Sequence, residues 1–232
     1  MASVKSWVEF WDGEHAIYVS DRHKLLHARA VGRDIIRHIA SPDAVVLDHG
    51  CGEANYAASV AAHCRQLYLC EAAPGLRQAL ARRVAVIRNV VVLAPAEVEG
   101  FPAGTLDLVV ANSLVQYLTR DELASLLRTW RGRLKPSGVL VVADVIPPDV
   151  SPLADAAALL RFAWTGGFLT AALAGLARTA LSDYRKIRVQ LGLATYSEAD
   201  FATLLAEAGF GLKLPATTDG YGRFDIMVAA KY

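Results

Sequence analysis

Short apolar runs alternate with amphipathic segments along most of the chain. Five runs of continuous hydrophobic residues have the length and composition of strands that are buried on both faces of a parallel sheet. They cover residues 44–50, 66–71, 89–94, 106–112 and 139–146. Because helical patterns separate them, the alternation predicts right-handed crossovers and a Rossmann-like, doubly wound α/β sheet with helices on both faces.

Helix boundaries are marked by capping residues and prolines. Ser20 is placed to cap a helix that runs to Ala40, and Ser197 is placed to cap one that runs to Ala208. Further helices are expected over 54–63, 74–83 and 121–134, with a turn at 136–138. The last two apolar runs, 209–215 and 224–231, predict a C-terminal antiparallel strand pair, so that the sheet has seven strands.

The pattern predicts a single domain in four segments. They are N-terminal lid helices (1–42), a ligand-binding core (43–146), a helical insertion on the substrate side (148–195), and a closing helix with the strand pair (197–232). Within the insertion, residues 162–177 carry no charge. This stretch is shorter than the roughly 20 residues that span a bilayer. It predicts a buried or lid helix pair, or a surface for a hydrophobic acceptor, a second copy or a membrane face.

Composition narrows the function classes. The 24 Lys and Arg residues nearly balance the 23 Asp and Glu residues, and a net charge of +1 gives no basis for a nucleic-acid partner. Three cysteines without paired spacing predict neither a disulfide framework nor a zinc site, and they fit a reducing compartment. Because the first residues do not resemble a signal peptide, the expected location is cytoplasmic.

Gly50 and Gly52 follow the first predicted strand, where a missing side chain lets backbone N–H groups approach a ligand. Glu71 closes the second strand, where a carboxylate can accept hydrogen bonds from both hydroxyls of a ribose. In an open parallel sheet, ligands bind at the carboxyl ends of the strands. The loop and the acid therefore predict an adenosine-containing ligand at this edge.

Two ligand types compete for such a loop. A dinucleotide requires G-x-G-x-x-G so that its pyrophosphate can sit on a helix N-terminus, but the third glycine is absent here. Glu53 would face the phosphates, whereas Asp48, just before the loop, suits a cationic group such as an amine. The residues favour a sulfonium amino acid over a pyrophosphate.

Four motifs, "VLDHGCGEA", "LYLCEAAPG", "LDLVVANSLVQYL" and "LKPSGVLVVADVIP", resemble in order and spacing those of the class I S-adenosylmethionine-dependent methyltransferases. The closing helix and strand pair are also similar to those of that family. The resemblance covers roughly residues 43–146 and 197–230, and it is specific as a set rather than motif by motif. It implies a methyltransferase whose cofactor is S-adenosyl-L-methionine.

The resemblance also implies roles for individual residues. Asp48, Gly50 and Gly52 would line the methionine part of the cofactor, and Glu71 would hold its ribose. The remaining implied contacts are Ala96 and Glu97 near the adenine and Asn112 beneath the cofactor.

The chain departs from the family pattern at two positions. Ala54 stands where the family commonly has a third glycine, and Pro95 stands where it often has an acid that meets the adenine amino group. Proline offers neither a side-chain acceptor nor a backbone donor, so backbone carbonyls or Glu97 would have to substitute.

No residue stands out as a catalytic base, and a base is needed only when the nucleophile must lose a proton. The candidates are Tyr18, His23, His27 and Tyr117, with Gln116 beside the last. His23 and His27 share a helix face, but without a nearby glutamate in a metalloprotease pattern no metal is expected. One of the two is expected to face the cofactor and the other solvent, with Tyr18 as a lid residue. Basic and aromatic residues that suit an acceptor with a polar head are Tyr184, Arg185 and Arg188, and a hairpin turn is expected at Tyr221 and Arg223.

The sequence thus predicts a methyltransferase that acts on a small, hydrophobic molecule such as a lipid, quinone or natural product. Two alternatives stay open. One is a non-catalytic binding protein that keeps the cofactor fold, and the other is a dinucleotide-dependent oxidoreductase. The apolar insertion leaves room for a peripheral membrane contact or a homodimer.

Overall fold

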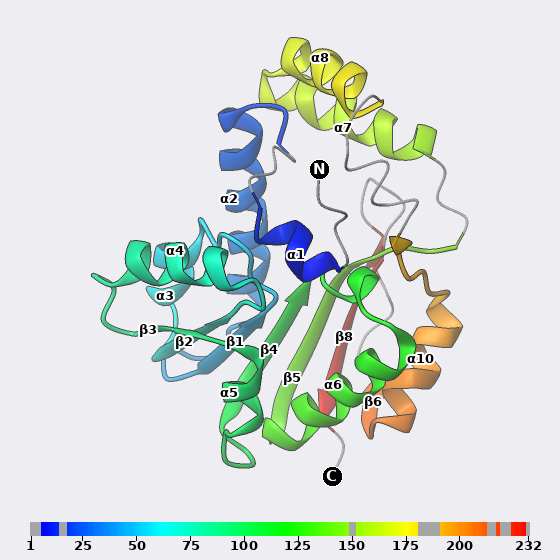
Figure 1. The fold of residues 1–232 in the computed structure, drawn as a ribbon. Coiled ribbons are helices and arrows are strands. Elements are labelled where there is room, and N and C mark those ends of the chain that lie inside the picture. Colours follow the sequence, from blue (N-terminus) through cyan, green and yellow to red (C-terminus); the bar gives the residue numbers. More distant parts are fainter. Residues whose placement is uncertain are drawn as a thin grey trace.

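The fold is built on one central sheet (Figure 1). The computed structural model describes residues 6–13, 18–148, 152–180, 191–212, 217–218 and 224–230. Among these, the strand order is β3-β2-β1-β4-β5-β8-β6, and β7 pairs with β8. The strands are β1 (Val45–His49), β2 (Gln66–Cys70), β3 (Val90–Leu93), β4 (Leu106–Asn112), β5 (Leu134–Val145), β6 (Phe210–Leu212), β7 (Thr217–Thr218) and β8 (Phe224–Ala230).

The sheet confirms the doubly wound α/β class. β1 to β5 are mutually parallel, and the chain order reverses between β1 and β4. β8 is antiparallel to both β5 and β6, as expected for the closing pair. The described residues form an eight-stranded sheet rather than the predicted seven, because the two-residue β7 also pairs with β8.

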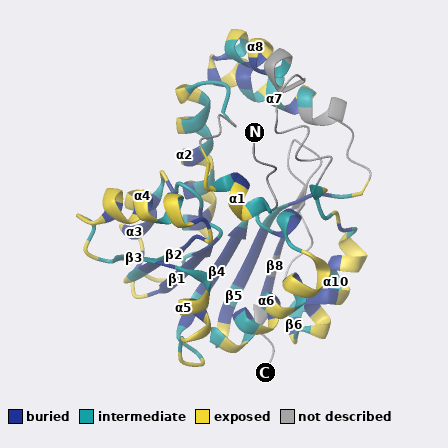
Figure 2. Cartoon of the chain, in the orientation of Figure 1, coloured by how far each residue is buried: buried dark blue, intermediate teal, exposed yellow. Residues whose placement is uncertain are grey.

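Helices cover both faces of the sheet, so the strands are buried while the outer sides of the helices are exposed (Figure 2). One face packs its core against α5 (Pro95–Glu99), α6 (Arg120–Arg133) and α10 (Glu198–Glu207). The other packs against α2 (Asp21–Arg37), α3 (Ala57–Ala61) and α4 (Pro74–Val84). Because the strands are buried on both faces, their sequences are continuous apolar runs.

The predicted caps are present. The Ser20 hydroxyl accepts a hydrogen bond from the His23 N–H at 3.2 Å, and Ser197 accepts one from Asp200 at 3.1 Å. The helix expected over 54–63 is shorter, however, because Ala54 has a φ of 41° that no right-handed helix accommodates.

The turn expected at 136–138 lies inside β5. The pairing moves from Leu106–Leu134 to Leu108–Val139, so the extra residues of β5 form an irregularity between two paired positions. A Cβ added to Gly138 would lie 2.9 Å from the Lys135 carbonyl, which explains a glycine at this tight position. Residues 136–138 therefore lie within β5 and do not form a separate turn before it.

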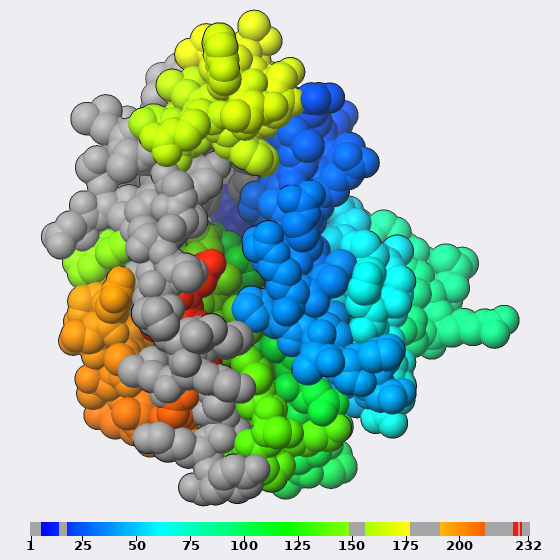
Figure 3. Space-filling view, turned by 180° about the vertical axis from the view of Figure 1, so that it is seen from behind, coloured from blue at the N-terminus to red at the C-terminus, as the bar shows by residue number. Residues whose placement is uncertain are grey.

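The apolar insertion forms a helical hairpin of α7 (Pro152–Gly166) and α8 (Leu169–Ala180), which confirms the predicted helix pair. It lies at one end of the molecule and packs on the start of α2 (Figure 1; seen from behind in Figure 3). Gly167, with a φ of 71°, makes the reversal. Gly175 is buried so closely against Val19 that an added Cβ would lie 2.2 Å from it. The hairpin therefore has a small core of its own, separate from the two cores of the sheet.

Candidate functional site

The loop after β1 has a left-handed backbone at alternate residues. Gly50, Gly52 and Ala54 have φ values of 77°, 57° and 41°. Glycine adopts this conformation freely, while an alanine there costs roughly 1–2 kcal/mol. A Cβ on Gly52 would meet nothing within 4 Å, so the loop leaves open space at this position. The geometry explains why the third position of such loops favours glycine, and it leaves Ala54 in a strained conformation.

Glu71 ties this loop to the end of β2. Its Oε2 accepts a hydrogen bond from the Gly52 N–H at 2.9 Å, and its Oε1 accepts one from the Ala73 N–H at 2.9 Å. A carboxylate has about four acceptor sites, so each oxygen can still accept a hydrogen bond from a ligand hydroxyl. Glu71 therefore holds the loop in shape, a role that the sequence pattern did not indicate.

We expect Glu71→Gln to weaken binding of S-adenosylhomocysteine by about 10- to 100-fold, because the amide places a donor against a backbone N–H and leaves it unpaired at a cost of about 1–3 kcal/mol. Isothermal titration calorimetry measures the effect. Glu122→Gln is the matched control, since Glu122 also accepts a backbone N–H, from Thr119 at 2.7 Å, but in the capping box of α6. Equal losses in both variants would contradict a role for Glu71 in the ligand site.

Asp48 lies beneath the loop as a buried acid. It is 1% exposed, and its Oδ2 accepts a hydrogen bond from the Tyr56 hydroxyl at 2.5 Å. Burial raises its pKa to about 7; the Tyr56 bond lowers it and the nearby Glu71 raises it. Among the described residues no cation pairs with Asp48. Two neighbouring acids at this edge suit a cationic ligand and oppose a pyrophosphate.

The other face of β1 carries His49, which is buried against α6. Its Nδ1 accepts a hydrogen bond from the Trp130 indole N–H at 3.1 Å, so the proton of the neutral ring is on Nε2. Burial lowers its pKa to about 4. His49 is therefore a neutral core residue that fixes the end of β1 rather than a proton carrier.

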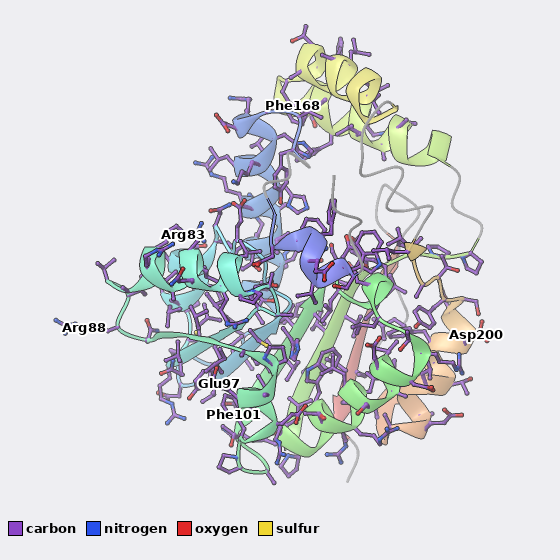
Figure 4. All side chains as sticks on the ribbon, in the orientation of Figure 1. Arg83, Arg88, Glu97, Phe101, Phe168 and Asp200 are labelled. Atoms are coloured by element: carbon purple, nitrogen blue, oxygen red, sulfur yellow. The ribbon has the colours of Figure 1, made fainter. Side chains whose placement is uncertain are left out.

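The residues expected near an adenine lie in the first turn of α5, immediately after β3. Ala96 and Glu97 are exposed there, and Figure 4 labels Glu97 on this helix. Glu97 Oε2 accepts a hydrogen bond from the Ala94 N–H at 2.7 Å, so it caps its own helix. Pro95 is the first helical residue, where its fixed φ suits the helix start.

The ends of β4 and β5 carry a strained pair that the sequence did not single out. Ser113, next to Asn112, and Asp144 have φ values of 54° and 63°, although neither is glycine. The Ser113 hydroxyl donates to Asp144 Oδ2, and the Asp144 N–H donates to Asp225 at 2.8 Å. Strain of this kind, about 1–3 kcal/mol per residue, concentrates at functional sites. The sequence signal for this pair was an acid within the fifth apolar run, two residues before its end.

Three of the catalytic candidates gather at the start of α2. The ring centroids of Tyr18 and His27 lie 5.6 Å apart, and those of His23 and His27 lie 6.4 Å apart. His23 faces neither the loop nor open solvent, contrary to expectation, because it stacks on Phe168 of the hairpin at 5.1 Å. Figure 4 labels Phe168 at this junction. Burial lowers the pKa of His23 to about 4, and the charge of the neighbouring His27 lowers it further to a smaller extent.

Tyr18 lies within electrostatic reach of Glu53 in the loop. Burial and the charge of Glu53 raise its pKa, so it stays protonated at neutral pH. Lys24 forms a 2.5 Å ion pair with Glu53, which links α2 to the loop. In the described part of the chain, no cluster of three histidine, cysteine or acidic residues is placed to hold a metal.

Tyr117 belongs to a different cluster, with α1 (Trp7–Trp11). This short helix lies next to the arrowhead of β4 in Figure 1, at the carboxyl edge of the sheet. Trp7 and Trp11 contact Tyr117 with centroid distances of 4.7 and 5.6 Å, while Phe10 is buried. Tyr117 and the neighbouring Gln116 follow β4 on a short 3-10 helix, η1 (Val115–Tyr117).

Asp12 attaches α1 to the start of α4. Its Oδ1 accepts hydrogen bonds from the N–H groups of Gly75 at 2.5 Å and Leu76 at 3.3 Å. α4 has no capping side chain of its own, since Ala73 precedes it. These contacts therefore hold α1 and its aromatic residues at the carboxyl edge of the sheet. The other residues suggested for the acceptor or a hairpin turn, namely Tyr184, Arg185, Arg188, Tyr221 and Arg223, lie outside the described residues.

Comparisons with known proteins agree with this geometry. Residues 47–142 match the family model described as a methyltransferase domain. The fold is similar to that of a SAM-dependent methyltransferase from Aquifex aeolicus, with 16% identity over 85% of this chain and 88% of that chain and a TM-score of 0.56. A search of curated proteins gives no significant match.

Two similar structures contain ligands. One is 1,6-didemethyltoxoflavin-N1-methyltransferase from Burkholderia thailandensis, with bound 1,6-didemethyltoxoflavin and S-adenosylhomocysteine (16% identity, 88% of this chain and 78% of that chain, TM-score 0.56). The other is geranyl diphosphate methyltransferase with geranyl diphosphate and sinefungin (12% identity, 87% of this chain and 78% of that chain, TM-score 0.57). At such identities the likeness establishes the fold.

Proposed function

We propose that the chain is a class I S-adenosylmethionine-dependent methyltransferase, as the match of residues 47–142 to a methyltransferase-domain model indicates, and that it methylates a small hydrophobic molecule, such as a lipid, quinone or natural product. The observation that carries the proposal is an open glycine loop beside two acids, Asp48 and Glu71, that form no ion pair within the described part of the chain. Gly52 offers space for a ligand, Glu71 offers acceptors for a ribose, and Asp48 offers negative charge for an amino group. A dinucleotide would place its pyrophosphate against the same acids.

S-adenosylmethionine, when bound, supplies an electrophilic methyl group on a sulfonium. The chain's own task is to hold the acceptor in line with that methyl at roughly 3–3.5 Å and to exclude water. Gly50, Gly52, Asp48 and Glu71 fix the ligand on the β1–β2 half of the edge. We assign Ala96 and Glu97 to the adenine side of the ligand because they follow β3. We assign Asn112 to its underside because it is the last residue of β4.

The acceptor then belongs on the β4–β5 half, beside the strained Ser113–Asp144 pair. For a hydroxyl acceptor, Asp144 is the carboxylate placed to take its proton, and Ser113 holds that carboxylate in position. With the first hydroxyl substrate found, an unchanged kcat and pH profile in Asp144→Asn would exclude this role. We assign no catalytic role to His23, since its ring packs under the hairpin.

A hydrophobic acceptor is supported by what surrounds this half of the edge. Trp7, Trp11 and Tyr117 present aromatic surface there, and the α7–α8 hairpin adds an apolar element at the same end of the molecule (Figure 1). We propose that residues 1–42, 43–146, 148–195 and 197–232 act together as one methyltransferase domain, with the first and third segments covering the site.

Methyl transfer from labelled S-adenosylmethionine tests the proposal. We expect incorporation into at least one class among quinols, phenolic natural products and fatty acids, and none into amino acids, sugars or nucleosides. Calorimetry with S-adenosylhomocysteine is run in parallel on the intact chain and on Gly50→Arg. Acceptance of polar metabolites alone would overturn the acceptor class, and tight binding of NADH without S-adenosylhomocysteine binding would overturn the cofactor.

Release of α1 should accelerate loss of the bound ligand. We expect Asp12→Ala to increase the dissociation rate of S-adenosylhomocysteine about fivefold, because the two N–H groups at the start of α4 lose an acceptor worth about 1 kcal/mol. Stopped-flow tryptophan fluorescence reports the rate, since Trp7 and Trp11 lie in α1. Asp12→Asn keeps the acceptor oxygen and is expected to behave like the wild type. A rate that does not change in the alanine variant would show that α1 does not cover the ligand.

A further inference from the structure

The α7–α8 hairpin exposes two large apolar side chains on its outer surface. Trp164 is 74% exposed and Leu173 is 54% exposed, whereas the inward residues Ala163, Phe168 and Ala172 are buried. The hairpin forms one extremity of the molecule in both views (Figures 1 and 3). Two large apolar side chains therefore project from a protruding element.

Basic residues outnumber acidic ones beside this surface, although Asp155 lies in α7 and Asp21 precedes Arg22. Residues 156–176 contain no acid, and their single charged residue, Arg161, is exposed. Arg22, at the start of α2, is exposed too, and its guanidinium donates to the Gly166 carbonyl at the end of α7. The helix α2 as a whole carries five basic and two acidic residues in DRHKLLHARAVGRDIIR. The two arginines, Arg161 and Arg22, therefore place positive charge beside the apolar tip.

We propose that the α7–α8 hairpin docks on an anionic lipid bilayer, with Trp164 and Leu173 in the interface and Arg161 and Arg22 on the phosphates. An apolar face with tryptophan and leucine beside basic residues is the pattern of interfacial membrane helices. Among the helices that the structure describes, none could span a bilayer. The inference deepens the proposed function, because a bilayer would supply a hydrophobic acceptor beside the site.

A second copy of the chain fits this surface less well. Trp164 and Leu173 together expose on the order of 300 Å² of apolar area. A standard protein interface buries about 800 Å² on each partner. Across a two-fold axis the same patch would also bring its arginines together, and like charges repel. An anionic surface instead neutralises both arginines.

Co-sedimentation with vesicles tests the proposal. Wild-type protein is expected to bind vesicles of phosphatidylcholine mixed with phosphatidylglycerol, to bind phosphatidylcholine alone weakly, and to detach at high salt. Trp164→Glu and Leu173→Glu should each lower the partition coefficient at least about tenfold, because a charge replaces interfacial apolar area. Val86→Glu is the matched control, since Val86 is 88% exposed between α4 and β3, away from the hairpin.

S-adenosylhomocysteine titration of the same samples separates this inference from the proposed function. Retained ligand binding with hairpin-dependent vesicle binding supports docking. Retained ligand binding without vesicle binding overturns docking and leaves the methyltransferase proposal standing. Equal vesicle binding by all variants, or a wild-type dimer that Trp164→Glu converts to a monomer in sedimentation velocity, also overturns it.

Discussion

Replacing Gly52 by leucine is expected to abolish binding of S-adenosylhomocysteine, with an affinity loss greater than about 100-fold, while the protein stays folded. A Cβ at this position meets nothing within 4 Å, so a side chain clashes with no part of the chain and fills the space assigned to the ligand. The φ of 57° costs roughly 1–2 kcal/mol for a non-glycine residue. That cost lowers the melting temperature by about 2–8 °C in a domain of this size.

Gly104→Leu is the matched control for this experiment. Gly104 has a φ of 66° and also has nothing within 4 Å of an added Cβ, but it lies in the turn before β4. Both variants should lose similar stability in thermal melts, and only Gly52→Leu should lose ligand binding in calorimetry. A substitution at Gly50 separates ligand binding from stability less well, because an added Cβ would lie 2.8 Å from Leu114. Unimpaired binding by Gly52→Leu would place the ligand elsewhere.

Affinity for S-adenosylhomocysteine is expected to fall about 20-fold between pH 7.5 and pH 5.5, because ligand binding requires the ionised form of Asp48. Its pKa of about 7 in the ligand-free protein means that the carboxyl is mostly neutral at the lower pH. A neutral carboxyl cannot attract the ligand's ammonium group. Calorimetry across this pH range gives the profile.

Two variants identify the titrating group. Asp48→Asn should bind weakly and without this pH dependence. Tyr56→Phe should move the inflection to higher pH, because the Tyr56 hydroxyl lowers the pKa of Asp48. A profile that keeps its inflection in Asp48→Asn would assign the titration to another group.

The same raised pKa has a stability consequence of opposite sign. A group whose folded pKa lies above its unfolded value stabilises the fold at low pH, and this contribution is lost as pH rises from 3.8 through about 7. Asp48→Asn should therefore raise the free energy of unfolding of the ligand-free protein at pH 8 by about 2–4 kcal/mol. Urea denaturation measures it.

The order of the elements follows from the sequence by itself. β4 matches the predicted run 106–112 residue for residue, and Ser20 and Ser197 cap the helices predicted for them. These features depend on neighbours in sequence: a strand buried on both faces is apolar throughout, and a cap bonds a residue three positions away. Glycines that follow a strand likewise mark a close backbone approach without reference to any distant residue.

The partners of the site residues were decided only by the tertiary structure. Asp12 caps a helix that begins at Pro74, Trp7 and Trp11 cover Tyr117, and His23 turns to Phe168 instead of the cofactor edge. Such contacts join segments far apart in the chain, and hydrophobic periodicity does not encode which segments meet. The raised pKa of Asp48 has the same origin, because desolvation depends on what covers a carboxyl and not on its neighbours in sequence.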